Sequence, residues 1–84
     1  MSMDEHAIKD AVIATLRRVA PEFDPKELEE NEPLRDQIDL DSVDWLNVLV
    51  GLNEQLHVDI PERDYERLRT FADLVGYLSA KLTA

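Results

Sequence analysis

A lone serine stands among aspartates in the segment "DLDSVDWL", which covers residues 39–46. Ser42 directly follows Asp41, Asp44 comes two residues later, and an apolar run begins at once. Side chains of these types have three common uses. They cap the start of a helix, their oxygens bind hard cations such as Ca²⁺, and a serine hydroxyl can act as a nucleophile or carry an attached group. The residues around Ser42 narrow this choice.

A calcium-binding loop is not predicted here. Such a loop places oxygen ligands at alternate positions, with a glycine at the sixth and a glutamate at the twelfth. Counted from Asp39, the sixth residue is Asp44 and the twelfth is Val50. Counted from Asp36, the third residue is Ile38. Neither register supplies the ligands, so we expect no metal site.

Catalysis by Ser42 is not predicted either. A nucleophilic serine needs a base, usually a histidine held by a carboxylate, and the chain has two histidines, His6 and His57. On one continuous helix, His57 would lie about 22 Å from Ser42, which is too far to take its proton. The chain also has no cysteine, which excludes a thiolate zinc site and a cysteine nucleophile. We therefore expect that the protein is not an enzyme.

Length and charge indicate the class of protein and of partner. The 84 residues make one domain, residues 1–84, and 44% hydrophobic with 33% charged residues suits a globular chain. The net charge of −10 repels nucleic acid phosphates and anionic lipid, and attracts proteins with Lys/Arg patches. The first residues do not form a signal peptide, and no apolar segment is long enough to span a membrane. We expect a free-standing, cytoplasmic monomer.

Hydrophobic periodicity predicts an all-α fold. One amphipathic helix covers residues 4–19, a second covers residues 42–56, and a long loop punctuated by prolines joins them over residues 20–40. Beyond Pro61 we expect a short helix, and then a last long helix that Thr70 or Asp73 can cap. The predicted fold is a four-helix bundle with three longer helices, one short helix and a long first loop.

The second predicted helix carries two apolar stripes. The stripe expected to face the core contains Trp45, Val48, Leu49, Leu52 and Leu56. The other stripe contains Val43, Leu46 and Val50. A small domain has no core left to cover this second stripe, so we expect it to be an exposed protein-binding surface. The alternative is a central helix buried on all sides.

The segment "LDSVDWLNVLVGLNEQLHVDIPERD" resembles the acyl carrier protein family, whose hallmark is Asp-Ser-Leu at the start of its second helix. Asp41, Ser42 and Asp44 match the acidic residues and the modified serine of the family, and Val43 replaces the usual leucine. The "IPE" at residues 60–62 matches the turn that follows this helix. The match continues without gaps through most of the rest of the chain.

The resemblance implies that Ser42 carries a phosphopantetheine arm, which a phosphopantetheinyl transferase moves from coenzyme A using magnesium. The thiol of the arm would hold acyl groups as thioesters and pass them between enzymes of fatty acid, polyketide or related lipid biosynthesis. This role suits a serine that has no base of its own, in a chain that has no thiol. Because both residues lie at the expected start of the helix, either Asp41 or Ser42 can be its cap. The expected partners are the transferase and acyl-loading and acyl-processing enzymes with basic patches.

The resemblance also implies a partner-facing surface that overlaps the second apolar stripe. Together with Asp41 and Val43 beside the serine, the expected partner-binding residues are Asp44, Leu46, Asn47, Val50, Glu54, Ile60 and Glu66.

Four further residues depart from the family pattern. Asn47 and Asn53 replace acidic residues, and Asp39 replaces a common glycine, which would matter if that position has a positive φ. Trp45 replaces smaller polar residues, and it either narrows the mouth of an acyl pocket or packs against the loop. These departures favour a specialised pathway over housekeeping fatty acid synthesis.

A second interpretation belongs to another class. A small acidic helical adaptor could bind a basic partner through Val43, Leu46 and Val50, with Ser42 unmodified and serving only as a cap. A carrier fold that has lost its modification is a third. The sequence does not identify the cargo, because one fold carries fatty acyl, polyketide, aminoacyl and lipid A chains.

Overall fold

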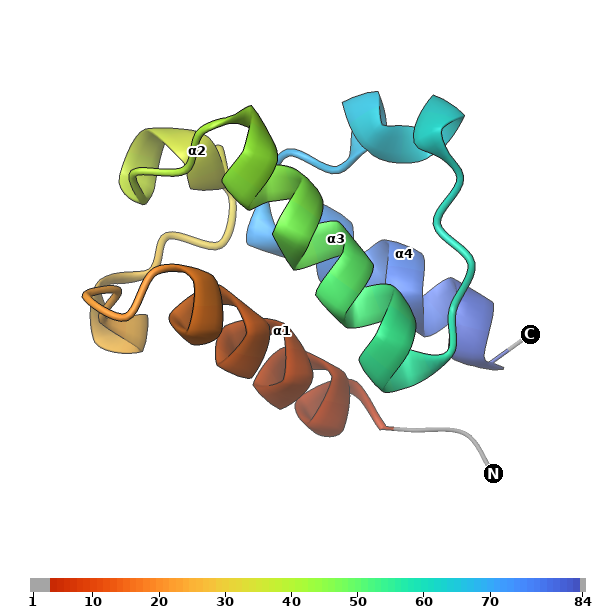
Figure 1. Cartoon of the computed structure of the whole chain (residues 1–84). Helices are drawn as coiled ribbons and strands as arrows, with labels where there is room; N and C mark the ends of the chain where they lie inside the picture. The colour runs from red at the N-terminus through yellow and green to blue at the C-terminus, as the bar shows by residue number, and fades with distance from the viewer. Residues whose placement is uncertain (1–3, 84) are drawn as a thin grey trace.

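A computed structural model describes residues 4–83 of the chain (Figure 1). In chain order the elements are α1 (Glu5–Val19), the 3-10 helix η1 (Pro25–Glu27), α2 (Leu34–Gln37), α3 (Ser42–Leu56), the 3-10 helix η2 (Glu62–Arg67) and α4 (Phe71–Thr83). Figure 1 shows α3 across the front of the molecule, with α1 beside it and α4 behind. Because the described residues form helices and no strand, the all-α prediction is confirmed.

The three long helices lie where the periodicity places them, and the connections differ from the prediction. The long first loop contains two short helical segments, η1 and α2, which the sequence did not predict. Asp24 caps η1, since its carboxylate accepts a hydrogen bond from the backbone N–H of Lys26 at 3.0 Å, and Pro25 supplies a helical φ at the first position. The short helix after Pro61 is a 3-10 helix and not an α-helix.

A close contact between α1 and α3 fixes the position of α3. Thr15 is buried, and its hydroxyl donates to the carbonyl of Ala11 at 2.9 Å and accepts from the Gln55 amide at 2.9 Å. A Cβ at Gly51 would lie 3.1 Å from the Thr15 methyl group, so glycine lets the two helices approach here. The buried polar side chain is therefore fully bonded, and it pins one helix to the other.

Two backbone hydrogen bonds tie the first loop to the start of α4. The N–H of Leu34 donates to the carbonyl of Arg69 at 2.8 Å, and the N–H of Ala72 donates to the carbonyl of Glu30 at 3.0 Å. Leu34 is also completely buried in the core. These contacts hold α2 beside the segment that precedes α4, although the two are far apart in the sequence.

The core is apolar and is drawn from every long helix. Its most buried large side chains include Ile8, Leu16, Leu49, Leu52, Phe71, Leu74 and Leu78. Among the described residues, no helix has both the length and the hydropathy needed to cross a membrane.

Candidate functional site

The start of α3 is held by a reciprocal pair of carboxylates. The Asp41 side chain accepts a hydrogen bond from the backbone N–H of Asp44 at 2.8 Å. The Asp44 side chain in turn accepts one from the N–H of Asp41 at 3.4 Å. Asp41 is therefore the cap, and Ser42 is the first residue of the helix. This settles the choice that the sequence left open.

Ser42 is exposed, and its hydroxyl forms no hydrogen bond with any residue among 4–83. Ser42 begins α3, and the capping hydrogen bonds at this helix start are made by the carboxylates of Asp41 and Asp44. His57 is at the opposite end of α3, so it cannot serve as a base for Ser42. The arrangement presents a hydroxyl to the solvent without activating it. Such a serine can receive a group, provided that another protein supplies the base.

A positive φ occurs at a different residue from the one that the sequence singled out. Within residues 4–83, His57 is the non-glycine residue with a positive φ, 54°, where it ends α3. Asp39 does not adopt this conformation, so aspartate at that position carries no backbone strain.

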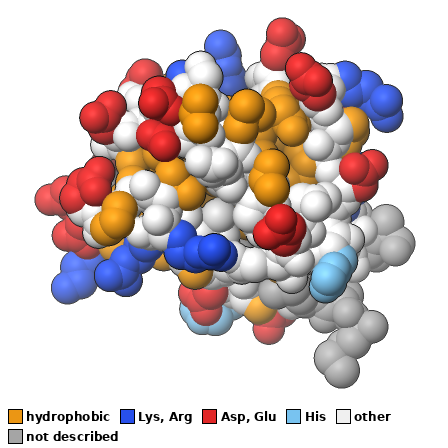
Figure 2. Space-filling view, in the orientation of Figure 1, with side chains coloured by type: hydrophobic (Ala, Val, Ile, Leu, Met, Phe, Trp, Pro, Cys, Tyr) orange, Lys and Arg blue, Asp and Glu red, His pale blue; other side chains and the backbone are white. Residues whose placement is uncertain are grey.

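The second apolar stripe of α3 lies on the surface. Val43, Leu46 and Val50 are 64%, 44% and 50% exposed. The first stripe is buried, and its members Trp45, Val48, Leu49, Leu52 and Leu56 are at most 8% exposed. Figure 2 shows hydrophobic and acidic side chains together on the face that α3 crosses. The prediction of two stripes is confirmed, and the alternative of a helix buried on all sides is wrong.

The remaining residues expected to face partners divide into two groups. Asn47, Glu54 and Glu66 are exposed, and Asp44 is partly exposed. Ile60 is 8% exposed and belongs to the hydrophobic core. The side chain of Ile60 packs inward just before Pro61, so it presents almost no surface to a partner. The expectation that Ile60 faces partners is therefore corrected, because this residue is part of the core.

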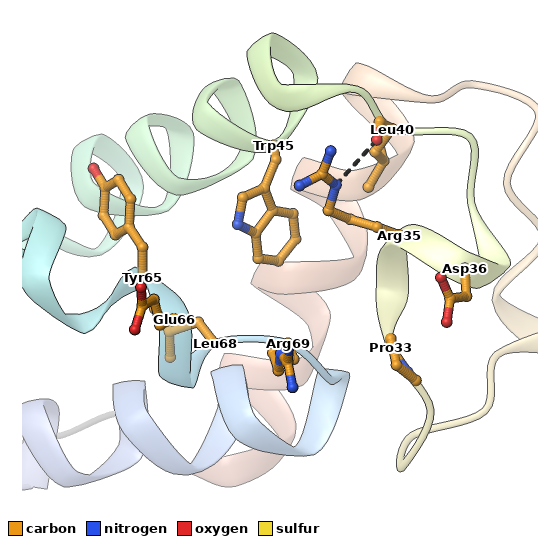
Figure 3. A pocket seen from close by; sticks show the side chains of 9 residues that line it. All are labelled: Pro33, Arg35, Asp36, Leu40, Trp45, Tyr65, Glu66, Leu68 and Arg69. Atoms are coloured by element: carbon orange, nitrogen blue, oxygen red, sulfur yellow. Dashed lines mark hydrogen bonds between the residues drawn. The ribbon is translucent and has the colours of Figure 1, made fainter.

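A groove of about 1060 Å³ opens beside the first turns of α3 (Figure 3). Its walls come from α2, from α3, and from η2 with the segment that leads to α4; the lining includes Pro33, Arg35, Trp45, Tyr65, Glu66 and Arg69. Trp45 lines this groove and is also 8% exposed within the core cluster. The indole thus forms a wall of the groove while it packs against the interior.

A hydrogen bond between η2 and α4 holds one wall of this groove. The Tyr77 hydroxyl donates to the Asp64 carboxylate at 2.6 Å. Burial and this bond to Asp64 together raise the pKa of Tyr77 to about 12. Lys81 lies over the Tyr77 ring, with its Nζ 5.4 Å from the ring centre. Because Tyr65 and Glu66 belong to η2, the bond from Tyr77 also positions those two side chains.

Sequence reasoning missed the arginines of the groove. Arg35 lies in α2 and Arg69 lies just before α4, and no motif connects them. They share a groove because the backbone bond between Leu34 and Arg69 joins the two segments. A pattern read along the chain holds no signal for such a contact.

The described residues contain no cluster of three or more histidine, aspartate or glutamate side chains arranged to hold a metal ion. The arrangement thus has one distinctive feature, an exposed serine at a capped helix start, beside an apolar stripe and a groove. The family model described as "Phosphopantetheine attachment site" matches residues 10–78.

The chain belongs to this family. It is similar to the acyl carrier protein of Bdellovibrio bacteriovorus, with 27% identity over 74 residues that cover 88% of each chain. It is also 27% identical over 77 residues to the mitochondrial acyl carrier protein of Neurospora crassa, and it spans 58% of the length of that relative.

The fold comparison agrees. A solution structure from Anaplasma phagocytophilum, provisionally named an acyl carrier protein, has a TM-score of 0.81 and 24% identity, and the match covers 96% of this chain and 94% of that one. The chain is therefore a phosphopantetheine-bearing carrier of acyl groups and not an enzyme. A carrier of this kind interacts with a phosphopantetheinyl transferase and with acyl-handling enzymes.

Proposed function

We propose that Ser42 carries the phosphopantetheine arm, and that the arm's thiol holds acyl groups as thioesters. One observation carries the proposal. Ser42 is the first residue of α3, exposed and without a hydrogen bond to the described residues, while Asp41 does the capping. A serine that is neither cap nor core is free to be modified without loss of the fold. The start of a helix also tolerates the negative charge of a phosphodiester.

The attachment step needs a second protein. The Ser42 oxygen attacks the phosphorus next to the pantetheine in coenzyme A, forming an O–P bond, and the pyrophosphate linkage breaks. The adenosine bisphosphate leaves with the bridging oxygen, and the hydroxyl proton passes to a base on the transferase. Ser42 has no histidine near it, since His57 ends the same helix at its far end. The transferase must therefore bring both the base and the magnesium.

The exposed stripe of α3 is the proposed docking surface. Val43, Leu46 and Val50 offer apolar contact next to Ser42, and the net charge of −10 attracts enzymes with basic patches. Electrostatic attraction of this kind speeds encounter more than it strengthens the complex. This suits a protein that must release each enzyme before it meets the next.

We further propose a specialised pathway in the cytoplasm. Asn47 is exposed on α3 and uncharged, which lowers the acidity of the docking surface relative to the family pattern. Asn53 has a structural role, because its amide donates to the carbonyl of Val58 at 2.6 Å and so fastens the end of α3. Faster acyl transfer by fatty acid synthase enzymes than by enzymes of a secondary lipid or polyketide pathway would contradict this proposal.

Intact-protein mass tests the attachment site. The protein is incubated with coenzyme A, magnesium and a broad-specificity phosphopantetheinyl transferase, beside Ser42→Ala and the matched control Ser79→Ala. We expect the wild type and Ser79→Ala each to gain one phosphopantetheine, and Ser42→Ala to gain none. A wild type that stays unmodified, while a known carrier is modified in the same mixture, contradicts the proposal. It would favour an unmodified adaptor or a carrier fold that has lost its modification.

Leu46→Ala tests the docking surface. Because Leu46 is 44% exposed, the stability of the fold should change little. Its loss from an interface should lower kcat/KM of the transferase by about tenfold, as for a typical interface anchor. An unchanged kcat/KM would exclude Leu46 from the docking surface.

A further inference from the structure

The attachment proposed for Ser42 would bring a phosphodiester to a helix start that already holds two carboxylates. Asp41 and Asp44 flank Ser42, and each of their side chains accepts a hydrogen bond from a backbone N–H of this helix start. These bonds keep both negative charges beside the serine. Like charges at short range repel each other, so a phosphate on Ser42 gains stability from a cation within its reach.

Arg35 is a cation that the structure holds against the backbone next to Ser42. The Nε of Arg35 donates to the carbonyl of Leu40 at 3.2 Å. Leu40 and Ser42 are two residues apart, so their Cα atoms are at most about 7 Å from each other. The bond to Leu40 also fixes the direction of the Arg35 side chain, which extends from α2 toward the start of α3 (Figure 3).

The guanidinium of Arg35 keeps donors for an anion. A guanidinium has five N–H donors, and the bond to Leu40 uses the one on Nε. Within residues 4–83, Arg35 forms no ion pair, although Asp36 and Glu66 line the same groove. Arg35 is also exposed, so its Nη groups are open to a ligand. Their planar arrangement suits a phosphate, whose oxygens accept two parallel hydrogen bonds.

Ser42 and Arg35 lie on the same side of α3. Ser42 and Trp45 are three residues apart, and residues at this spacing are neighbours on a helix surface. A long helical side chain leans toward the preceding turn, so the indole of Trp45 extends toward the turn that begins with Ser42. Figure 3 shows the guanidinium of Arg35 beside this indole, between it and Leu40.

A second arginine of the groove lies away from Leu40. Arg69 precedes α4, and Figure 3 shows its side chain below the indole of Trp45. The guanidinium of Arg69 forms no hydrogen bond or ion pair with the described residues, since its recorded bonds all come from the backbone. The two arginines have the same charge and line the same groove, but Arg35 is the one bonded to the backbone beside Ser42. Arg69 is therefore a matched control for a contact made by Arg35.

We propose that Arg35 binds the phosphodiester of the arm, and that this contact sets the direction in which the arm leaves α3. This rests on the proposed attachment at Ser42. The charge-assisted hydrogen bonds offset the repulsion from Asp41 and Asp44 and limit rotation of the phosphate about the Ser42 side chain. The arm then extends from the side of α3 on which the groove opens. Arg35 is a positioning residue, because the thioester forms at the other end of the arm.

Urea unfolding with and without the arm tests the contact. Each protein is loaded from coenzyme A by a broad-specificity transferase, complete loading is verified by intact mass, and both forms are unfolded in about 0.15 M salt, which screens more distant charges. The ratio of the two unfolding equilibrium constants gives the effect of the arm on stability. Arg35→Gln should change this ratio about fivefold against the folded loaded form, as expected for a strong exposed ion pair.

Two variants separate the contact from other roles of the arginines. Arg69→Gln should leave the effect of the arm as in the wild type. Arg35→Lys keeps the charge without the planar donors and should give an intermediate ratio. A purely structural role of the bond to Leu40 would destabilise the loaded and unloaded forms equally, so it would not change the ratio.

NMR of the wild type gives a second measurement that needs no variant. A bound phosphate slows the rotation and the solvent exchange of the Arg35 Nη groups, so their signals should sharpen and shift when the arm is attached. Arg18 is exposed at the end of α1, and its side-chain signals should not change on loading.

The outcomes separate this proposal from the attachment itself. An effect of the arm that is the same in the wild type and in Arg35→Gln overturns the contact and leaves Ser42 as the attachment point. Arg35 signals that do not change on loading also overturn it. Equal changes in Arg35→Gln and Arg69→Gln assign the effect to the overall charge of the groove, which overturns it as well. Failure of the wild type to load overturns the attachment at Ser42, and the contact with it.

Discussion

The helices α3 and α4 begin with the same capping arrangement. At α3 the side chains of Asp41 and Asp44 bond reciprocally to each other's backbone N–H groups. At α4 the Thr70 hydroxyl accepts from the N–H of Asp73 at 2.9 Å, and the Asp73 carboxylate accepts from the N–H of Thr70 at 3.2 Å. At both starts the side chain of the cap accepts from the backbone N–H three positions later, and the side chain of that later residue accepts from the N–H of the cap.

The two helices differ in the residue that follows the cap. The first residue of α3 is Ser42, which is exposed, whereas the first residue of α4 is Phe71, which is 1% exposed. The first loop covers the start of α4 through its bonds to Arg69 and Ala72. The capping arrangement is thus a local feature that does not by itself mark a functional site. Packing decides which helix start becomes core and which is presented to other proteins.

The largest expected difference between the two starts concerns Phe71. Replacing it by alanine leaves a cavity in the core and should lower the free energy of unfolding by about 3–5 kcal/mol. This is a large share of the stability of a small domain. Urea unfolding followed by helical circular dichroism measures it. A loss below about 1 kcal/mol would mean that the start of α4 is less buried than the structure shows.

The two caps should contribute equally. Asp41→Ala and Thr70→Ala are each expected to lower the free energy of unfolding by about 1 kcal/mol, because each leaves a first-turn N–H without its acceptor. Asp41→Asn keeps an acceptor oxygen and should cost much less. The same urea titration compares the three variants. A large loss for Thr70→Ala with none for Asp41→Ala would break the equivalence of the two helix starts.

Tyr77→Phe tests the contact between α4 and η2. It removes the hydrogen bond to Asp64 and should lower the free energy of unfolding by about 1 kcal/mol at neutral pH.

The contribution of Tyr77 should also depend on pH. Its pKa is raised from 10.0 to about 12, so the folded protein holds this proton more tightly than the unfolded chain. The stabilisation is therefore complete below pH 10 and is lost as the pH rises through about 12. Urea titrations between pH 8 and pH 12, with Tyr77→Phe as the reference, isolate the pH-dependent contribution of Tyr77 to the free energy of unfolding. Parallel pH profiles for the two proteins would show that the bond is absent in solution.

The smallest expected effect on stability belongs to Ser42. Ser42→Ala should change the free energy of unfolding by less than about 0.5 kcal/mol, because the residue is exposed and is not the cap. The same variant should lose all modification by the transferase. Loss of about 1 kcal/mol would instead assign Ser42 a capping role, which the sequence had left open.

The sequence determined the local features of the molecule. The spacing of apolar residues predicted α1, α3 and α4 and both stripes of α3, because a helix repeats every 3.6 residues whatever surrounds it. The resemblance identified the family, because Asp41, Ser42 and Asp44 form a motif that is local in the sequence, at the start of one helix.

Tertiary structure decided the features that need contacts between distant segments. Two residue types can cap α3, and only the folded backbone shows that Asp41 does so and that the Ser42 hydroxyl forms no hydrogen bond with residues 4–83. Ile60 follows the family pattern in the sequence, yet packing turns it into the core. Arg35 and Arg69 meet in one groove because a hydrogen bond joins their segments. Periodicity describes one helix at a time, whereas a groove depends on how several elements pack together.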